Sequence, residues 1–407
     1  MRCRFCKNEV NDVFLDLGFQ PPSNSYLTSD DLKSYEITYP LRLFVCNNCW
    51  LVQTEDFVKE TTFFNEDYAY FSSTSVTWVE HAEKYSKMII NKLKLDINSL
   101  VIEIASNDGY LLKNFKNEKI PCIGIEPTKS TADASEKIGI NVIKEFFNEN
   151  LANNLVCNLN YADLVIGNNV YAHVPDLNDF TKSINLILKP EGVVTLEFPH
   201  LQKLIEFNQF DTVYHEHFSY FSFFTVTEIF KKHGLKIFDV EKLETHGGSL
   251  RIYGCKISAN HKISDNVETL LNEEQAYGMK NLSFYINFQK SVNVIKNDLL
   301  TFLIENVNKG KIIAAYGAAA KGNTLLNYCG IKSDLIKYVS DAAIAKQGKF
   351  LPGSHIPIEN PDYLFSNTPD YVIILPWNIA DEVIKQNIEL YNTNVQFFKA
   401  IPKLTLL

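Results

Sequence analysis

The chain has 407 residues, 46% of them hydrophobic, which is enough for two or three domains with sizeable cores. Its 39 basic and 48 acidic side chains leave a net charge of -9, which argues against a broad surface for nucleic acid. No charged leader precedes an apolar N-terminal core, and no apolar run approaches the roughly 20 residues of a spanning helix, so we expect a cytoplasmic protein without a membrane partner.

Two CxxC pairs mark the N-terminal segment. Cys3 and Cys6 form one pair, and Cys46 and Cys49 form the other. Each pair places two thiolates on one tight turn, as tetrahedral zinc requires. The alternatives are four unrelated buried thiols or a redox dithiol, but a redox site needs only one pair. Four thiolates leave no open position for water, so we predict a structural zinc site.

An α/β domain is predicted after this segment. From about Thr61 to Lys92, the pattern "STSVTWVEHAEKYSKMIINKLK" has apolar side chains at helical spacing and predicts a long amphipathic helix. Short apolar runs then alternate with helical stretches, and we expect buried strands within residues 99–105, 122–127, 162–169 and 192–199. This alternation predicts a parallel sheet covered on both faces.

Polar residues follow the ends of these predicted strands, where doubly wound sheets bind ligands. The fingerprint GxGxxG is absent, which favours S-adenosylmethionine (SAM) over a dinucleotide, because SAM has no pyrophosphate. Glu126 is placed to accept from ribose hydroxyls, and amides after the third strand can hold adenine or the methionine portion. The predicted cofactor residues are Glu103, Ser106, Asn107, Gly109, Glu126, Asn168 and Asn169. The alternative is a flavodoxin-like domain with polar strand-end loops.

The stretch "VYHEHFSYF" lies past the end of the predicted strand that contains Glu197. In an extended segment Tyr214 and Glu216 would share one face, and His215 and His217 would share the other. Such residues can be aromatic packing or a reaction site. A metal site is less favoured, because HExxH and other ligand spacings are missing.

A second α/β unit is predicted beyond the helix-prone residues 266–308. There "YGAAAKGN" follows a strand and precedes a helix expected to begin near Thr324, so its small residues and Lys321 suit a pyrophosphate. Asp341 resembles the ribose-binding acid of a nicotinamide site, which makes an NAD-dependent dehydrogenase or epimerase an alternative. The predicted substrate-binding residues are His246, Arg251, Lys321, Asn323, Asp341 and Trp377.

Several long motifs resemble those of the SAM-dependent C-methyltransferases that act on nucleotide-linked keto-sugars. They include the two CxxC pairs, "DYAYFSSTS", "EIASNDGYLL", "GNNVYAHVPDLNDF", "EFPHLQKLIEFNQFDTVYHEHFSY", "THGGSLRIY", "YGAAAKGNTLLNYCGI" and "LPWN". The resemblance implies a class I SAM-dependent methyltransferase (Rossmann-like) core, a small N-terminal four-cysteine zinc module and a second Rossmann-like α/β domain. On this basis we expect a zinc module at 1–60, the methyltransferase core with its catalytic segment at 61–255, a helical connector at 256–308 and a nucleotide-sugar-binding domain at 309–407.

The same resemblance implies the chemistry. His217 would be the base, with Tyr214 and Glu216 beside it, and either Tyr68 or Tyr70 would enter the site. The implied reaction moves a methyl group from SAM to the carbon next to the ketone of a nucleotide-linked, dTDP-type keto-deoxysugar. A sugar O-methyltransferase is the second hypothesis. A nucleic-acid reader built on the zinc module is a third, and the acidic balance speaks against it.

Overall fold

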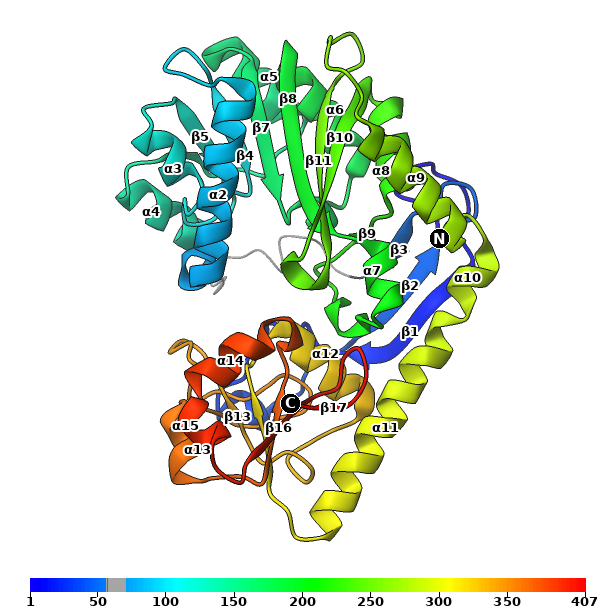
Figure 1. The fold of residues 1–407 in the computed structure, drawn as a ribbon, viewed down its shortest axis with the longest axis vertical. Coiled ribbons are helices and arrows are strands. Elements are labelled where there is room, and N and C mark those ends of the chain that lie inside the picture. The colour runs from blue at the N-terminus through cyan, green and yellow to red at the C-terminus, as the bar shows by residue number, and fades with distance from the viewer. Residues whose placement is uncertain (56, 58–70) are drawn as a thin grey trace. The chain divides into compact units, whose positions relative to one another are not determined.

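The computed structural model describes residues 1–55, 57 and 71–407, so Tyr68 and Tyr70 lie outside the described residues (Figure 1). The chain divides into two compact, discontinuous units. The first unit contains residues 1–10, 46–200 and 218–280, and the second contains residues 11–45, 201–217 and 281–407. No helix among the described residues has the length and apolar character needed to cross a membrane.

The first unit contains a seven-stranded sheet in the order β10-β11-β8-β7-β4-β5-β6. Its strands are β4 (Val101–Ile104), β5 (Cys122–Ile125), β6 (Asn141–Ile143), β7 (Ala162–Asn168), β8 (Leu188–Pro199), β10 (Leu235–Leu243) and β11 (Ser249–Lys256). The five strands from β8 to β6 are parallel, and β11 is antiparallel to both of its neighbours. The four predicted strands are therefore confirmed as β4, β5, β7 and β8.

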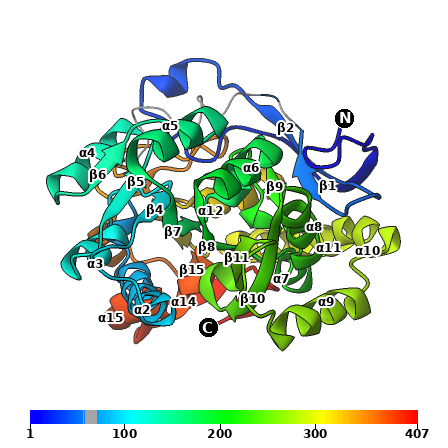
Figure 2. The same ribbon diagram turned by 90° about the horizontal axis from the view of Figure 1, so that it is seen from above.

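Helices cover both faces of this sheet. Figure 2 shows α2 (Val76–Leu93) and α3 (Leu112–Asn117) on one face, with α5 (Glu149–Leu159) and α6 (Leu177–Ile187) on the other. The remaining helices of the unit are α4 (Lys129–Lys137), α8 (Phe223–Lys232) and α9 (Asp265–Tyr277). The predicted amphipathic helix is confirmed as α2, whose buried side chains Trp78, Ala82, Tyr85 and Ile89 recur at helical spacing and join the core.

Short 3-10 turns and a small strand pair complete the first unit. The turns are η2 (Ser72–Thr74), η3 (Tyr171–His173) and η5 (Thr245–Gly247). Strands β3 (Val52–Thr54) and β9 (Ser219–Tyr220) pair antiparallel. Hydrogen bonds thus join a segment near the cysteines to one from the middle of the chain.

The second unit contains a mainly parallel sheet in the order β14-β13-β12-β15-β16-β17. Its strands are β12 (Ile313–Tyr316), β13 (Val339–Ser340), β14 (Ile358–Glu359), β15 (Tyr371–Ile374), β16 (Gln396–Lys399) and β17 (Thr405–Leu406), of which β17 is antiparallel to β16. The antiparallel pair β1 (Asp12–Gln20) and β2 (Tyr39–Val45) belongs to the same unit. The second predicted α/β sheet is therefore confirmed.

The helices of the second unit are α7 (Leu201–Glu206), α10 (Leu282–Ile286), α11 (Phe288–Asn308), α12 (Ala320–Cys329), α13 (Asp362–Ser366), α14 (Ala380–Gln386) and α15 (Ile388–Tyr391), with 3-10 turns η1 (Asp31–Lys33), η4 (Phe210–Thr212) and η6 (Trp377–Ile379). Helix α12 begins at Ala320, four residues before the predicted start at Thr324. Lys321 and Asn323 therefore lie inside the first turn of this helix instead of preceding it.

The compact units do not coincide with the predicted domain boundaries. The residues between the two cysteine pairs, 11–45, belong to the second unit, although the pairs themselves belong to the first. The segment that contains Tyr214, Glu216 and His217 also belongs to the second unit, whereas we expected it within the methyltransferase core. Packing between segments far apart in the chain decides these memberships, and no local sequence pattern reports it.

Candidate active site

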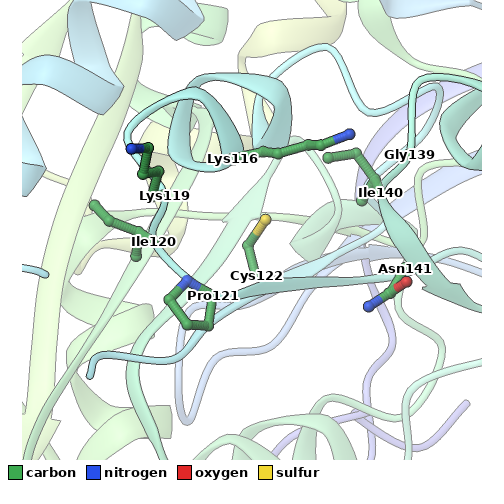
Figure 3. A pocket seen from close by; sticks show the side chains of 8 residues that line it. All are labelled: Lys116, Lys119, Ile120, Pro121, Cys122, Gly139, Ile140 and Asn141. Atoms are coloured by element: carbon green, nitrogen blue, oxygen red, sulfur yellow. The ribbon is translucent and has the colours of Figure 1, made fainter. Parts of the chain in front are cut away.

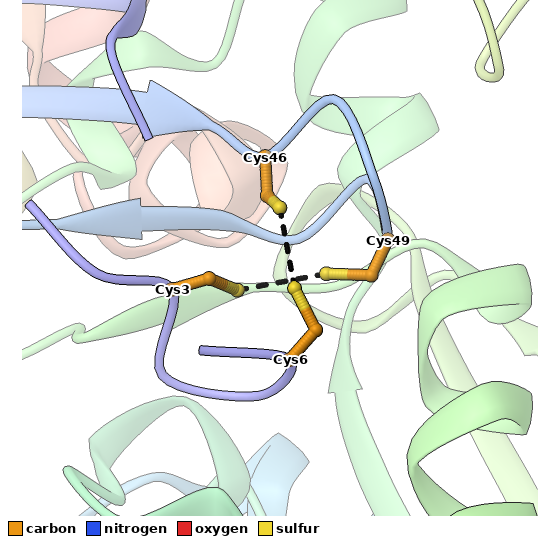
Figure 4. A group of neighbouring side chains, drawn as sticks. All are labelled: Cys3, Cys6, Cys46 and Cys49. Atoms are coloured by element: carbon orange, nitrogen blue, oxygen red, sulfur yellow. Dashed lines mark hydrogen bonds between the residues drawn. The ribbon is translucent and has the colours of Figure 1, made fainter. Parts of the chain in front are cut away.

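The four cysteines of the two CxxC pairs meet in the first unit (Figure 4). Their sulfur atoms all lie within 4.8 Å of one another, and the closest pairs, Cys3 with Cys49 and Cys6 with Cys46, are 3.5 Å apart. Each pair sits on a tight backbone turn, because the amides of Lys7 and Trp50 donate to the carbonyls of the first cysteines. Four converging thiols are the donor set of a closed, tetrahedral zinc site.

Two features of the thiols suit a metal. Cys3, Cys46 and Cys49 are buried, and Cys6 is half-buried. Hydrogen bonds with Cys46 and Cys49 hold the pKa of the Cys3 thiol below its usual range, because they stabilise the thiolate. The residues thus fit Zn²⁺ without a solvent-filled coordination position.

The loop after β4 has a backbone shaped for close approach to a ligand. Ala105, Asn107 and Gly109 all have positive φ angles, of 57°, 50° and 77°. A Cβ atom on Gly109 would lie 2.6 Å from the Ser135 hydroxyl oxygen, so this position has both a conformational and a steric need for glycine. Strained non-glycine residues that cluster in one strand-end loop are typical of ligand sites.

Several buried polar atoms at this edge of the sheet have no hydrogen-bond partner among the described residues. They are Glu103 Oε2, Ser106 Oγ, both amide atoms of Asn168 and Asn169 Oδ1. Leaving such groups unpaired costs about 1–3 kcal/mol each, so they are normally paired in the functional protein. Their convergence at the ends of β4 and β7 fits a polar ligand such as SAM.

The two acidic residues of this site are in different environments. Burial, with the nearby charges of Glu126 and Asp108, raises the pKa of Glu103 well above its usual range. Glu126 also has a raised pKa because of burial, but its oxygens accept hydrogen bonds from the backbone amides of Asn107 and Thr128, each at 2.9 Å. Glu126 therefore shapes the loop after β4, a role that sequence reasoning did not predict.

The loop that carries His246 joins the same edge. His246 has a φ angle of 53°, and its Nε2 lies 3.1 Å from the amide nitrogen of Asn169. Its ring also packs against Trp78 with a centroid distance of 5.1 Å. The hydroxyl of Thr245 donates to Glu197 Oε1 at 3.0 Å, which anchors the loop to the end of β8. His246 thus lies beside the predicted cofactor residues of the first unit.

Arg251 has acidic partners within the protein. Its guanidinium donates to Glu197 Oε2 at 2.7 Å and to Glu241 Oε2 at 3.3 Å, and it is almost fully buried. Burial opposes the charge of Glu197, but hydrogen bonding from His81 and the charge of Arg251 hold the pKa of Glu197 below its usual range. The predicted phosphate contact of Arg251 remains a prediction, and the geometry describes a buried ion pair.

A pocket of about 250 Å³ opens elsewhere on the first unit (Figure 3). It is lined by Lys116, Lys119, Ile120, Pro121, Cys122, Gly139, Ile140 and Asn141. Strand β5 begins at Cys122, whereas Glu126 follows its other end. The pocket is therefore at the opposite end of the strand from the predicted cofactor residues.

In the second unit, Tyr214 and His217 lie close together on a turn. The amide of His217 donates to the carbonyl of Tyr214 at 3.0 Å, and the two rings are 4.1 Å apart between centroids. The expectation for an extended segment, with Tyr214 and His217 on opposite faces, is thus wrong, because the chain folds back at residues 215 and 216. The turn brings a phenol and an imidazole together.

The imidazole of His217 is oriented by the backbone. Its Nδ1 lies 3.2 Å from the carbonyl oxygen of Thr212. A carbonyl accepts but cannot donate, so Nδ1 carries the proton and the lone pair of the neutral ring is on Nε2. In this tautomer, Nε2 can accept a proton, as the proposed general base must.

Glu216 and His215 hydrogen-bond to residues of the segment 11–45. The amide nitrogen of Asn24 donates to both oxygens of the Glu216 carboxylate, at 2.9 and 3.1 Å. Burial raises the pKa of Glu216 to about 7, and the Asn24 hydrogen bond acts against this rise. His215 contacts the carbonyl of Tyr39 at 3.3 Å, and burial lowers its pKa. Sequence reasoning missed Asn24, because its partner is 192 positions away.

Three of the predicted substrate-binding residues, Lys321, Asn323 and Trp377, lie in or beside α12. Lys321 lies over the ring of Trp377 at 4.9 Å, and the Trp377 indole donates to Asp211 Oδ2 at 2.7 Å. The amide nitrogen of Asn323 donates to the carbonyl of Ser23 at 2.6 Å. Both Asn323 and Ser23 keep a buried side-chain oxygen without a partner among the described residues. These residues offer positive charge, an aromatic face and unpaired polar atoms to a ligand.

Asp341 has a structural role in the same region. Its Oδ2 accepts from the amide of Ala318 at 2.7 Å, and its Oδ1 accepts from the amide of Ala343 at 2.8 Å. The carboxylate therefore fixes the "YGAAA" loop after β12. Ribose recognition by Asp341, which the NAD alternative needs, remains a prediction.

The sheet order and the strand-end site define the first unit as a class I SAM-dependent methyltransferase fold, accompanied by a four-cysteine zinc module and a second α/β domain. Three family models match in this order: "Putative zinc binding domain" over residues 3–64, "Methyltransferase domain" over 79–240 and "C-methyltransferase C-terminal domain" over 244–402. The C-methyltransferase NovU of Streptomyces niveus is 31% identical over 401 residues, which cover 98% of this chain and 95% of that relative. The chain belongs to this C-methyltransferase family, and it is a SAM-dependent enzyme with a zinc site.

Solved structures with related folds include the magnesium protoporphyrin IX methyltransferase of Synechocystis with bound SAH. Its sequence is 11% identical, and the match covers 48% of this chain and 91% of that chain, with a TM-score of 0.35. A SAM-dependent methyltransferase from Archaeoglobus fulgidus is 17% identical and covers 43% of this chain and 94% of that chain, with a TM-score of 0.33.

Proposed function

We propose that this C-methyltransferase acts on a nucleotide-linked keto-deoxysugar of the dTDP type, in the cytoplasm, and methylates the ring carbon next to the ketone. The observation that carries the proposal is the bond from His217 Nδ1 to the Thr212 carbonyl, since it leaves the basic lone pair on Nε2. Methylation of a carbon requires a base that first removes a proton from the substrate. Methylation of a sulfur atom that is already nucleophilic does not require such a base.

His217 removes the proton from the carbon next to the ketone. That carbon is acidic because its carbanion becomes an enolate, with the charge on oxygen, and neutral imidazole has an ordinary pKa near ~6.5 that suits this step. The Tyr214 phenol, whose ring is 4.1 Å from the His217 ring, donates a hydrogen bond to the developing enolate oxygen. The carboxylate of Glu216 orients the turn and favours the imidazolium that forms. A further contribution from Tyr68 or Tyr70 stays a prediction.

SAM supplies an electrophilic methyl group when bound. In the first unit, Glu103, Ser106, Asn168 and Asn169 have buried atoms without a partner in the described part of the chain, and these atoms would hold its polar groups. Glu126, Asn107 and Gly109 shape the loop after β4 and keep its backbone close to the ligand. These residues orient the donor, and orientation of this kind lowers the entropic cost of the transfer.

The second unit supports recognition of the nucleotide diphosphate. Lys321 in the first turn of α12 provides positive charge beside the helix N-terminus, and Trp377 provides an aromatic face for stacking. Asn323 adds a buried carbonyl oxygen without a partner among the described residues. His246 and Arg251 remain proposed contacts, although Arg251 must then act through its pairing with Glu197.

The test is an assay of the purified protein with SAM and a dTDP-keto-deoxysugar. We expect release of S-adenosylhomocysteine and a product with a new carbon-bound methyl signal in carbon NMR. His217→Asn should lower kcat by about 100-fold or more, since general-base catalysis contributes roughly that factor. A methoxy signal, or an unaffected His217→Asn enzyme, would overturn the proposal.

A matched control exists in the same unit. His355 has a φ angle of 56°, which asparagine tolerates, and it pairs with the partly exposed Glu36. His355→Asn should therefore retain the wild-type rate. Equal losses in both variants would indicate a general effect of replacing histidine on folding.

A further inference from the structure

Asn24 reaches the reaction turn from a distant part of the chain. It lies between β1 and η1, in the turn-rich stretch that the sequence places among the zinc-module residues, yet it belongs to the second unit. Its Nδ2 lies 2.9 and 3.1 Å from the two oxygens of Glu216. The Asn24 side chain is exposed, whereas Glu216 is only 5% exposed. An exposed amide thus covers a buried carboxylate.

The neighbours of Asn24 hold it in place. The carbonyl of Ser23 accepts from the Asn323 side chain at 2.6 Å, and the hydroxyl of Tyr26 donates to the carbonyl of Ala318 at 2.6 Å. Both partners belong to the loop and first turn of α12. Since the backbone is tied on either side of Asn24, little further entropy is lost when its short side chain takes one orientation.

The orientation of the Asn24 amide follows from its partner. A carboxylate only accepts hydrogen bonds, so the nitrogen of the amide must face Glu216 and its carbonyl oxygen must face away. Two contacts from one donor group fix the plane of the carboxylate as well as its position. A surface asparagine with a purely solubilising role has no reason to adopt this geometry.

We propose that Asn24 is a positioning residue for the methyl transfer: by donating to both oxygens of Glu216, it holds this carboxylate in the orientation in which it assists His217. The inference rests on the proposed function and adds a residue from the N-terminal segment to it.

The titratable surroundings of Glu216 set its response to pH. Burial raises its pKa to about 7, and Asn24 lowers that pKa by stabilising the charged form. Tyr26 lies close enough that burial, then Asp341 and then Glu216 raise its own pKa, so it stays a neutral phenol. His215 and His217 flank the carboxylate along the chain. Removing the Asn24 amide should therefore move the ionisation of Glu216 to higher pH.

The experiment compares Asn24→Leu, which has nearly the same shape without donors, with Asn24→Ala and the control Ser25→Ala. Ser25 is the exposed neighbour of Asn24 in the same segment. With SAM and the keto-sugar nucleotide, we expect both Asn24 variants to lose about 10-fold or more in kcat, as for loss of a transition-state interaction. Their acidic limb of kcat against pH should shift upward, whereas Ser25→Ala keeps the wild-type profile.

A double-mutant cycle separates positioning from general structure. Because Asn24 acts through Glu216, Asn24→Leu should cause no further loss of kcat in a Glu216→Gln background. A loss of the same factor in both backgrounds, or wild-type kcat and pH profile in Asn24→Leu and Asn24→Ala, would overturn the inference. Since Asn24 is exposed, both variants should unfold near the wild-type Tm, and Asn24→Ala keeps the test open if the leucine variant misfolds. If the wild-type protein methylates no keto-sugar nucleotide, the proposed function itself fails, which is a distinguishable result.

Discussion

The indole nitrogen of Trp377 donates to Oδ2 of Asp211 at 2.7 Å and thereby joins the loop after β15 to the turn that precedes His217. Asp211 is fully buried, and its other oxygen has no partner among the described residues. Thr324 makes a second link, because its hydroxyl donates to the carbonyl of Val213 at 2.8 Å. Trp377, helix α12 and the segment that leads to the proposed base His217 are thus parts of one hydrogen-bonded frame in the second unit.

This frame predicts a graded effect of changes at Asp211. Asp211→Ala removes the acceptor for the Trp377 indole and should raise KM for the sugar nucleotide by about 10-fold, the value of one buried hydrogen bond to a charged group. Asp211→Asn retains an accepting oxygen and should have a smaller effect. Steady-state kinetics at saturating SAM measure both. An equal rise of KM in the two variants would indicate that the charge near Lys321, which both variants remove, matters and that the bond to Trp377 does not.

The zinc cluster predicts a loss of stability without a direct loss of chemistry. Cys46→Ser should reduce bound zinc from about one per chain to almost none and lower the free energy of unfolding by roughly 4 kcal/mol or more, because a structural metal is lost. Elemental analysis and denaturant unfolding measure the two quantities. Cys157 is exposed and outside the cluster, so Cys157→Ser serves as the control and should retain zinc.

The buried Glu103 predicts proton release when SAM binds. Its pKa is raised by burial and by the charges of Glu126 and Asp108, so it holds its proton to higher pH than an exposed glutamate does. The positive charge of SAM favours the carboxylate, lowers this pKa and expels the proton. Isothermal titration in buffers of different ionisation enthalpy should detect the release.

Glu103→Gln should abolish this proton release and weaken SAM binding by roughly 10-fold to 100-fold, since a hydrogen bond to a charged group is lost. Glu118→Gln changes an exposed acid of the same unit and is the matched control. If Glu103→Gln binds SAM with unchanged affinity and still releases a proton, SAM does not bind at the end of β4.

Glu216 predicts a specific dependence of stability on pH. Its folded-state pKa of about 7 is above the ordinary value of 4.5, so the folded state binds its proton more tightly than the unfolded state. The stability from this group is therefore complete below about pH 4.5 and is lost as the pH rises through about 7. Glutamine stays neutral at every pH and has no such loss.

The measurement is the free energy of unfolding of wild type and Glu216→Gln between about pH 4 and about pH 8.5. This range extends beyond both the unfolded-state and the folded-state pKa of Glu216. The wild-type value should fall relative to the variant by up to roughly 3 kcal/mol. Glu389→Gln, at an exposed position of the second unit, should follow wild type. Parallel curves for Glu216→Gln and wild type would show that the pKa of Glu216 does not differ between the folded and the unfolded state.

Local patterns were enough to predict most of the secondary structure. The runs at 101–104, 122–125 and 162–168 are mainly apolar, as is typical of a covered parallel strand, and they form β4, β5 and β7. The start of α12 was misplaced because Ala320 to Gly322 read as a loop of small residues, whereas the structure continues the helix through them. Small residues permit both conformations, so their neighbours in space decide.

The amino-acid sequence by itself determined the zinc ligands, because a CxxC spacing brings two thiols together within one turn, and it determined the sheets, because hydrophobic burial follows the periodicity of the chain. Only the tertiary structure decided that residues 11–45 and 201–217 pack with the C-terminal sheet, that Tyr214 and His217 share a turn, and that Asn24 donates to Glu216. These contacts join residues as far apart as Ser23 and Asn323, 300 positions along the chain, and their free energy comes from packing and burial that no local pattern encodes.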